Sequence, residues 1–236
     1  MNWDDYSAAL FDLDGVVTPT AEVHMRAWSA MFNEFLTARG VAEPYTDDDY
    51  FAHVDGKPRY EGVAAFLASR GIDLPQGDPS DDPSAQTVCG LGNRKNDAFN
   101  EVLEADGVQA YPGSVRLLEA LAARSMPMAI VSSSNNAPAV LETAGVAHFF
   151  SFVMHGGVAS ERGIAGKPAP DTFVVAAQEL GVTPAQAVVL EDALSGVQAG
   201  AAGHFGLVIG VDRGAGTAAL TDAGATLVVK DLEELL

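Results

Sequence analysis

Residues 8–15 read AALFDLDG, and this short stretch decides how the rest of the chain is interpreted. A small apolar run that ends in acidic residues and glycine predicts a buried strand over residues 8–11, which delivers Asp12 to its carboxyl end. Asp14 follows two positions later. Open α/β sheets bind ligands outside the carboxyl ends of their strands, so the two acids are candidate site residues. A surface turn of the DxD type is the alternative interpretation.

From Ser114 onward the pattern of the sequence is different: helical stretches alternate with short runs of apolar and β-branched residues. Strands are expected over residues 127–131, 152–153, 187–190, 206–211 and 225–229, and helices over 137–144, 170–180 and 195–202. Alternation of this kind predicts βαβ units and a parallel sheet. The final DLEELL is expected to form a C-terminal helix.

The first strand has no βαβ partner near it in the sequence. Instead, helical patterns cover residues 20–39, 59–69 and 93–105, and PQGDPSDDPS at 75–84 is typical of an exposed loop. The simplest organisation is a Rossmann-like α/β core of residues 1–19 and 110–236, interrupted by a helical insertion of residues 20–109.

The composition excludes several classes of function. The 236 residues include 13 Lys and Arg against 32 Asp and Glu, which gives a formal charge of −19. Such a chain is poorly suited to nucleic acid or anionic membranes. A single cysteine excludes an internal disulfide, and no run approaches the roughly 20 apolar residues that span a membrane. We expect a cytoplasmic protein.

Other polar residues follow or interrupt the predicted elements of the core. Glu191 and Asp192 follow the apolar run VVL, although acids there also suit a helix N-terminus. Ser132 follows MAIV, where a hydroxyl can bind phosphate or cap a helix. Lys167 lies in a loop rich in Gly and Pro, where a lysine is usually solvated. Taken singly, each of these signals favours the structural interpretation.

The combination is more informative than its members. A nucleophilic carboxylate, a hydroxyl, a lysine and a second acid pair are the groups that phosphoryl transfer through an aspartyl-phosphate requires. Two carboxylates at one strand end repel unless a cation lies between them, and carboxylate oxygens suit Mg²⁺.

Four segments in order then resemble the motifs of the haloacid dehalogenase-like superfamily: FDLDGVVT, IVSSS, GKPAPDTF and VVLEDALSG. This resemblance implies that Asp12 is the nucleophile, and that Asp14 is the general acid/base and lends its backbone carbonyl to Mg²⁺. It implies that Ser132 and Lys167 bind the phosphoryl group. Glu191 and Asp192 would complete the metal site. An acid at position 14 implies phosphate-ester chemistry rather than dehalogenation, because a leaving alkoxide needs a proton.

The insertion is similar to the helical cap of β-phosphoglucomutase-like members of that superfamily. The similar segments are TPTAEVHMRAW at 18–28, VDGKPR at 54–59 and NRKND at 93–97. The resemblance makes His24 a hinge histidine, sets Arg59 on the substrate's second phosphate and turns Lys95 toward the sugar. Ser134 and Asn136 match the remaining phosphate-loop positions.

The sequence departs from the pattern of this subfamily at three places: Pro19 replaces an Asp, Asn135 replaces a Lys, and the loop between Arg59 and Lys95 is longer.

We expect a monomeric, Mg²⁺-dependent phosphohexomutase that converts β-D-glucose 1-phosphate to glucose 6-phosphate. The alternatives are a phosphatase of a small sugar phosphate or related metabolite and a non-catalytic metabolite-binding regulator. Intact Asp12, Asp14, Lys167 and Asp192 argue against the regulator, since binding needs no acid/base.

Overall fold

The computed structural model describes all 236 residues of the chain. It contains a six-stranded sheet in the order β3-β2-β1-β4-β5-β6, and every neighbouring pair of strands is parallel. The strands are β1 (Ala8–Phe11), β2 (Met128–Val131), β3 (Phe152–Met154), β4 (Ala187–Glu191), β5 (Leu207–Val211) and β6 (Leu227–Val229). A parallel sheet with helices between its strands confirms the predicted Rossmann-like α/β fold class.

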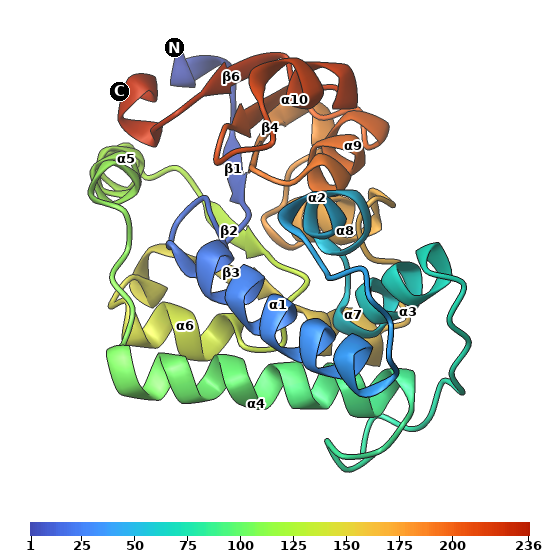
Figure 1. Cartoon of the computed structure of the whole chain (residues 1–236). Coiled ribbons are helices and arrows are strands. Elements are labelled where there is room, and N and C mark those ends of the chain that lie inside the picture. The colour runs from blue at the N-terminus through green and yellow to red at the C-terminus, as the bar shows by residue number, and fades with distance from the viewer. The chain divides into compact units, whose positions relative to one another are not determined.

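The strand order creates a topological switch point between β1 and β4. From β1 the chain adds β2 and β3 on one side, and later adds β4, β5 and β6 on the other. Right-handed crossovers then require the helices of the two halves to cover opposite faces of the sheet (Figure 1). The helices are α5 (Pro112–Ala123) and α6 (Ala137–Thr143) in the first half, and α8 (Asp171–Glu179), α9 (Leu194–Ala202) and α10 (Thr217–Ala223) in the second.

Strand β1 is apolar at every position because both of its faces are covered. All four residues are buried, and Leu10 belongs to an apolar cluster with Phe173 of α8 and Val197 of α9. The ring of Phe11 lies 6.0 Å from that of Phe150. Strands buried on both faces read as continuous apolar runs, and burying a side chain as large as Leu or Phe contributes about 1.5–3 kcal/mol. The residues that follow β1 therefore start from a firmly held position.

Contacts along the chain define two compact units. The core unit comprises Met1–Thr20 and Val108–Leu236, and the inserted unit comprises Ala21–Gly107. The inserted unit is built from α1 (Thr20–Ala38), α2 (Asp47–Asp49), a π-helical turn (Tyr50–Val54), α3 (Arg59–Ser69) and α4 (Val88–Asp106). Its own apolar cluster contains Trp28, Phe32, Tyr45 and Phe66.

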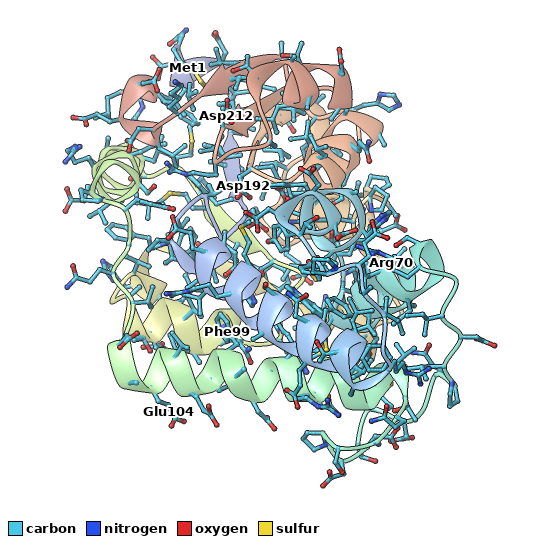
Figure 2. The ribbon with its side chains drawn as sticks, viewed as in Figure 1. Met1, Arg70, Phe99, Glu104, Asp192 and Asp212 are labelled. Atoms are coloured by element: carbon cyan, nitrogen blue, oxygen red, sulfur yellow. The ribbon has the colours of Figure 1, made fainter.

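Helix α4 begins five residues before the predicted start at position 93, because Thr87 caps it. The Thr87 Oγ1 accepts a hydrogen bond from the Gly90 N–H at 2.9 Å. Gly90 and Gly92, within the first five residues of α4, each weaken helix propensity by about 1 kcal/mol, so this segment shows little helical pattern in the sequence. Figure 2 shows Phe99 and Glu104 on opposite sides of the helix, where Phe99 is buried and Glu104 is exposed.

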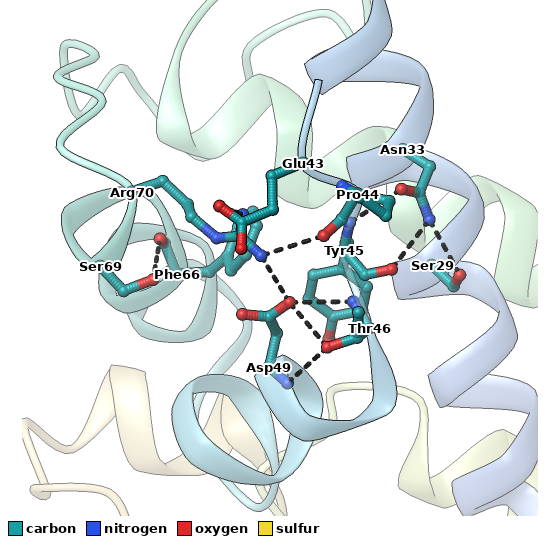
Figure 3. Close-up of polar contacts among 10 residues, drawn as sticks. All are labelled: Ser29, Asn33, Glu43, Pro44, Tyr45, Thr46, Asp49, Phe66, Ser69 and Arg70. Atoms are coloured by element: carbon teal, nitrogen blue, oxygen red, sulfur yellow. Dashed lines mark hydrogen bonds and ion pairs between the residues drawn. The ribbon is translucent and has the colours of Figure 1, made fainter. Parts of the chain in front are cut away.

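Polar contacts at Arg70 hold the segment that precedes α2 (Figure 3). Arg70 Nη2 donates to Asp49 Oδ2 at 2.7 Å, and the same carboxylate accepts the Thr46 backbone N–H at 2.9 Å. On α1, the Asn33 amide accepts the Tyr45 N–H at 2.9 Å and donates to the Tyr45 carbonyl at 3.3 Å. These bonds fix the start of α2 within the inserted unit.

Other helical elements also differ from the sequence-based expectation. The C-terminal residues form a 3₁₀ helix, Leu232–Leu235, instead of an α-helix, and Trp3 Nε1 donates to the Leu235 carbonyl at 3.0 Å. Helices α7 (Gly156–Glu161) and α10 were not predicted, since six or seven residues show at most two turns of a 3.6-residue period; α6, which is equally short, was predicted over residues 137–144. No helix combines the length and the apolar character needed to cross a membrane.

Candidate active site

The acids singled out in the sequence meet at the switch point of the sheet. Phe11 of β1 lies beside Leu190 of β4, and the Asp12 N–H donates to the Leu190 carbonyl at 2.9 Å. This register brings Asp12 level with Glu191, the last residue of β4. Asp12, Glu191 and Asp192 each offer a carboxylate oxygen, and these atoms lie within 4.8 Å of one another.

Lys167 reaches this acid cluster from the loop between α7 and α8. Its Nζ donates to Asp12 Oδ1 at 2.5 Å, to the Val131 carbonyl at 2.8 Å and to Glu191 Oε1. The side chain is only 1% exposed, so a single buried cation joins the ends of β1, β2 and β4. An ammonium group with three acceptors uses all of its donors.

The electrostatics of the cluster show an excess of negative charge. Burial raises the pKa of Asp12 well above its usual range; Lys167 opposes this effect, while the charges of Glu191 and Asp14 add to it. Burial alone would lower the pKa of Lys167, but the Asp12 and Glu191 carboxylates outweigh burial and raise it. Lys167 therefore keeps its positive charge, while burial is the main reason why Asp12 resists ionisation.

The residues present fit a hard divalent cation. Carboxylate oxygens are the donors that Mg²⁺ prefers, and here the oxygens of three carboxylates meet while Lys167 supplies one positive charge. Glu191 is the least available ligand, because Oε1 accepts from Lys167 and Oε2 accepts the Ala193 N–H at 2.9 Å. Asp12 and Asp192 are the better candidates for direct contact.

Two glycines allow these carboxylates to come so close to the backbone. Gly15 has a φ of +90°, and a Cβ at this position would overlap the Asp192 carboxylate. A Cβ at Gly196 in α9 would overlap the Glu191 carboxylate. Any larger residue at either position would displace an acid from the cluster, and Gly15 also adopts a backbone conformation that other residues disfavour.

Asp14 is held by hydroxyl groups on both of its carboxylate oxygens. Thr20 Oγ1 donates to Asp14 Oδ1, and Ser132 Oγ donates to Asp14 Oδ2 at 3.4 Å. Thr18 Oγ1 lies 2.7 Å from Thr20 Oγ1 and extends the network. A carboxylate oriented in this way is suited to giving or accepting a proton at a substrate oxygen.

The loop after β2 presents serine hydroxyls at the same edge of the sheet. The Ser134 N–H donates to Ser132 Oγ at 3.1 Å, and the Asn136 N–H donates to Ser134 Oγ at 3.1 Å. Helix α6 begins directly afterwards at Ala137. The two hydroxyls are therefore positioned by main-chain donors two residues further on, as in turns that precede a helix.

In the inserted unit, the structure brings His24 and Lys95 together. His24 lies on α1, and its Nδ1 is within hydrogen-bonding distance of Lys95 Nζ on α4. The Lys95 Nζ also lies 4.9 Å from the centre of the Trp28 ring and 5.2 Å from that of Phe99. The His24 ring stacks on Phe99 at 4.1 Å. Aromatic faces thus surround this ammonium group.

Arg59 lies apart from this pair, at the first position of α3. Its Nη2 donates to Asn96 Oδ1 at 2.6 Å. Because Lys95 and Asn96 are adjacent on α4, their side chains leave the helix about 100° apart, and each orients a different group. A neutral amide acceptor fixes the guanidinium and leaves its positive charge intact, as a site for an anion requires.

The sequence motifs indicated no role for two of these residues, Thr20 and Asn96. Thr20 lies in TPTAEVHMRAW and Asn96 in NRKND, but only the folded chain reveals that Thr20 bonds Asp14 and that Asn96 bonds Arg59. A hydroxyl at the start of a helix is usually explained by capping, so the sequence carries no separate signal for its contact with a carboxylate. The roles inferred for the other site residues stay predictions.

The fold and the acid cluster define a class of protein. The family of haloacid dehalogenase-like hydrolases matches residues 6–204, and the chain belongs to this family. It is therefore an enzyme.

Individual proteins are similar to this chain over most of its length. The chain is 50% identical to a protein of Mycobacterium bovis named beta-phosphoglucomutase, over 97% of this chain and 91% of the relative. It is 32% identical to the Escherichia coli fructose-1-phosphate phosphatase YqaB, over 84% of this chain and 92% of the relative. The structure of a beta-phosphoglucomutase from Clostridium difficile has a TM-score of 0.77 at 24% identity, covering 98% and 93% of the two chains, and shares the fold.

Proposed function

We propose that this enzyme is a Mg²⁺-dependent phosphohexomutase that converts β-D-glucose 1-phosphate to glucose 6-phosphate through a phosphate carried on Asp12. One observation favours a mutase over a phosphatase. The 50% identity to the Mycobacterium bovis protein extends over 97% of the chain, so it includes the inserted unit with Arg59 and Lys95. We also infer that the enzyme acts as a monomer in the cytoplasm on a small-molecule sugar phosphate.

In the proposed reaction, a carboxylate oxygen of Asp12 attacks the phosphorus atom. The bond between phosphorus and the sugar oxygen breaks, and Asp14 gives its proton to that oxygen. Lys167 already donates to Asp12 Oδ1, so the other oxygen, Oδ2, is the one that attacks. In the return step a sugar hydroxyl oxygen attacks the phosphorus atom carried by Asp12. The bond between phosphorus and the Asp12 oxygen breaks, which restores the carboxylate, and Asp14 takes the hydroxyl proton.

Mg²⁺ would be held by Asp12, the Asp14 backbone carbonyl and Asp192, with Glu191 nearby. When bound, the ion supplies positive charge that favours the charged phosphoryl group. Ser132 and Lys167 bind phosphoryl oxygens in this proposal, and Ser134 and Asn136 extend that loop. Without the cation, repulsion between the buried carboxylates and the phosphate should prevent binding.

A mutase also needs a second anion site, because one phosphate of a sugar bisphosphate is always held while the other is transferred. Arg59 is the proposed ligand for the held phosphate, and its orientation by Asn96 supports this role. His24 and Lys95 are the proposed contacts for the sugar. The inserted unit would exclude water from the phosphorylated Asp12, since hydrolysis there would turn the enzyme into a phosphatase.

The decisive experiment supplies β-D-glucose 1-phosphate with a trace of glucose 1,6-bisphosphate and Mg²⁺, and follows glucose 6-phosphate and free phosphate together. We expect isomer to accumulate much faster than phosphate, and excess EDTA to stop both. Asp12→Asn serves as the catalytically inactive control.

Phosphatase activity is the second candidate, and the relation to the Escherichia coli fructose-1-phosphate phosphatase favours it. Release of phosphate from every hexose phosphate tested, with no isomer formed, would replace the mutase proposal by this one. Full activity in excess EDTA would exclude the magnesium part of either proposal.

A further inference from the structure

The turn that carries Asp14 is held from outside by three consecutive backbone carbonyls. Each accepts a hydrogen bond from a different residue far away in the sequence: Gly15 from Arg213 Nε at 2.7 Å, Val16 from Ser114 Oγ at 2.7 Å, and Val17 from the Tyr111 N–H at 2.9 Å. Three bonded carbonyls in a row leave the turn little freedom to rotate. All of these residues belong to the core unit.

Arg213 contacts both the Gly15 carbonyl and Tyr111, the residue whose N–H donates to Val17. Besides Gly15, its guanidinium donates through Nη1 to the Lys230 carbonyl at 2.9 Å and lies 4.0 Å from the centre of the Tyr111 ring. Its Nη2 is buried and makes no hydrogen bond, an arrangement that is unfavourable unless the remaining contacts offset it. The rigid fork of arginine suits simultaneous donation in two directions above an aromatic face, and lysine cannot reproduce it.

The backbone beneath Arg213 is itself fixed. Asp212 Oδ1 accepts the N–H groups of Gly214 at 3.1 Å and Gly216 at 3.0 Å. The Asp212 N–H donates to the Val229 carbonyl at 2.8 Å, which ties the loop after β5 to β6. The backbone of Arg213 is therefore held in place by β6 and by Asp212. Through its hydrogen bond to the Gly15 carbonyl, Arg213 fixes the turn relative to the sheet.

We propose that Arg213, seated on Tyr111, is a positioning residue that fixes the orientation of the Asp14 carboxylate. From Gly15 the effect reaches Asp14 through the peptide unit that joins the two residues, and Thr20 Oγ1 donates to the same Asp14 carboxylate. Arg213 touches none of the reacting atoms. The inference rests on the proposed role of Asp14 as the acid that protonates the leaving oxygen.

A displaced acid has a distinctive kinetic consequence. Protonation matters most when the leaving oxygen is strongly basic, and it matters little when the leaving group departs readily as an anion. Loss of Arg213 should therefore slow phosphoryl transfer from phenyl phosphate more than from 4-nitrophenyl phosphate, whose phenol is more acidic. A general loss of folding, magnesium binding or Asp12 reactivity would slow both transfers equally.

The test compares the single-turnover release of phenol and of 4-nitrophenol by the full chain at saturating Mg²⁺. For Arg213→Gln we expect the rate with phenyl phosphate to fall about tenfold more than the rate with 4-nitrophenyl phosphate. Tyr111→Leu should shift the ratio in the same direction, whereas Tyr111→Phe, which keeps the ring, should not. Arg162→Gln is the matched control, because Arg162 forms an exposed ion pair with Glu179.

The variant Asp14→Asn distinguishes failure of the positioning role of Arg213 from failure of the proposed acid role of Asp14. If Asp14→Asn shows the leaving-group effect but Arg213→Gln slows both esters equally or not at all, the positioning role is wrong and the proposed function stands. If Asp14→Asn shows no leaving-group effect, the proposed role of Asp14 fails, and the role of Arg213 fails with it. Should Arg213→Gln not fold, the contrast between Tyr111→Leu and Tyr111→Phe decides.

Discussion

Two buried lysines, one in each unit, are stabilised in different ways. Lys167 of the core unit donates to the carboxylates of Asp12 and Glu191, so its charge is compensated by opposite charge. Within the inserted unit, Lys95 contacts the His24 ring nitrogen and the faces of Trp28 and Phe99. The first environment is built from ionised groups and the second from aromatic groups.

This difference indicates how each unit responds to substitution of its buried residues. Removing one member of a buried ion cluster leaves the other charges without compensation, which is strongly unfavourable. An aromatic site loses a modest cation–π attraction, and a neutral side chain of similar size can still pack in it. The core unit should therefore lose stability when its buried cation is removed and lose catalysis when its acids are changed, whereas the inserted unit should change its specificity while remaining folded.

The largest expected effect belongs to Asp12→Asn. The amide has no nucleophilic carboxylate, so turnover should fall by roughly 10⁴-fold or more, the scale seen when enzymes lose a nucleophile. The fold should persist because Glu191 still pairs with Lys167. Turnover and thermal unfolding should be measured together, and labelled phosphate recovered on a different residue in the wild-type enzyme would refute the assignment.

Lys167→Met should have the next largest effect, this time on stability. Without the ammonium group, Asp12 and Glu191 remain buried without a cation, and we expect a loss of about 3–5 kcal/mol in the free energy of unfolding at pH 7. The matched variant Lys95→Met should lose at most about 2 kcal/mol, because its aromatic contacts suit an apolar chain. Urea unfolding in the presence of EDTA measures both.

The pH dependence of Lys167→Met tests the same cause. Burial already raises the pKa of Asp12, and loss of Lys167 removes an influence that lowers it. A carboxyl whose pKa is higher in the folded state stabilises the fold below its unfolded pKa, and this stabilisation disappears as the pH rises through the folded pKa. The deficit of the variant should therefore shrink as the pH falls toward about 4. An equal deficit at all pH values would contradict the charge argument.

Arg59→Ala should have a smaller effect, confined to specificity. A charge-assisted bond between arginine and phosphate contributes roughly 1.5–3 kcal/mol, which corresponds to a ten- to hundredfold loss of isomerisation. Hydrolysis of 4-nitrophenyl phosphate should hardly change, so the ratio of the two activities is the measurement. Arg39→Ala, an exposed arginine of the same unit, serves as the control. An unchanged ratio would remove Arg59 from the proposed phosphate site.

Arg70→Ala should have the smallest effect, and only on stability (Figure 3). Its ion pair with Asp49 is partly buried, and we expect a loss of about 1–2 kcal/mol, with no change in the ratio of activities. A change in that ratio would indicate that the contact also shapes the proposed substrate site.

Acid sensitivity provides a second measurement on Arg70→Ala. Burial would raise the pKa of Asp49, but hydrogen bonds from Thr46 and Arg70 outweigh burial and lower it. A lowered folded pKa adds stability above the unfolded pKa of about 4, and this contribution disappears as the pH falls through the folded pKa. The variant should lose part of this acid dependence, which unfolding experiments between pH 6 and pH 3 would detect.

Local sequence was sufficient for the strands and for the acids that follow them. Continuous apolar runs such as AALF and MAIV have one stable use in an α/β protein, as strands buried on both faces. The acids after β1 and β4 could therefore be expected at the carboxyl edge of a parallel sheet. The short helices α7 and α10 and the true start of α4 were not predicted, because a cap or a helix of six or seven residues leaves little periodicity.

The sequence by itself determined the fold class, the family and the chemical groups available for phosphoryl transfer. Only the tertiary structure decided which groups meet. Lys167 contacts Asp12 across 155 residues, and Asn96 contacts Arg59 across 37. Propensity and periodicity describe a residue's neighbours along the chain, whereas these contacts follow from the order of strands in the sheet and the packing of helices. That order depends on the burial of the whole apolar surface, which no short stretch of sequence specifies.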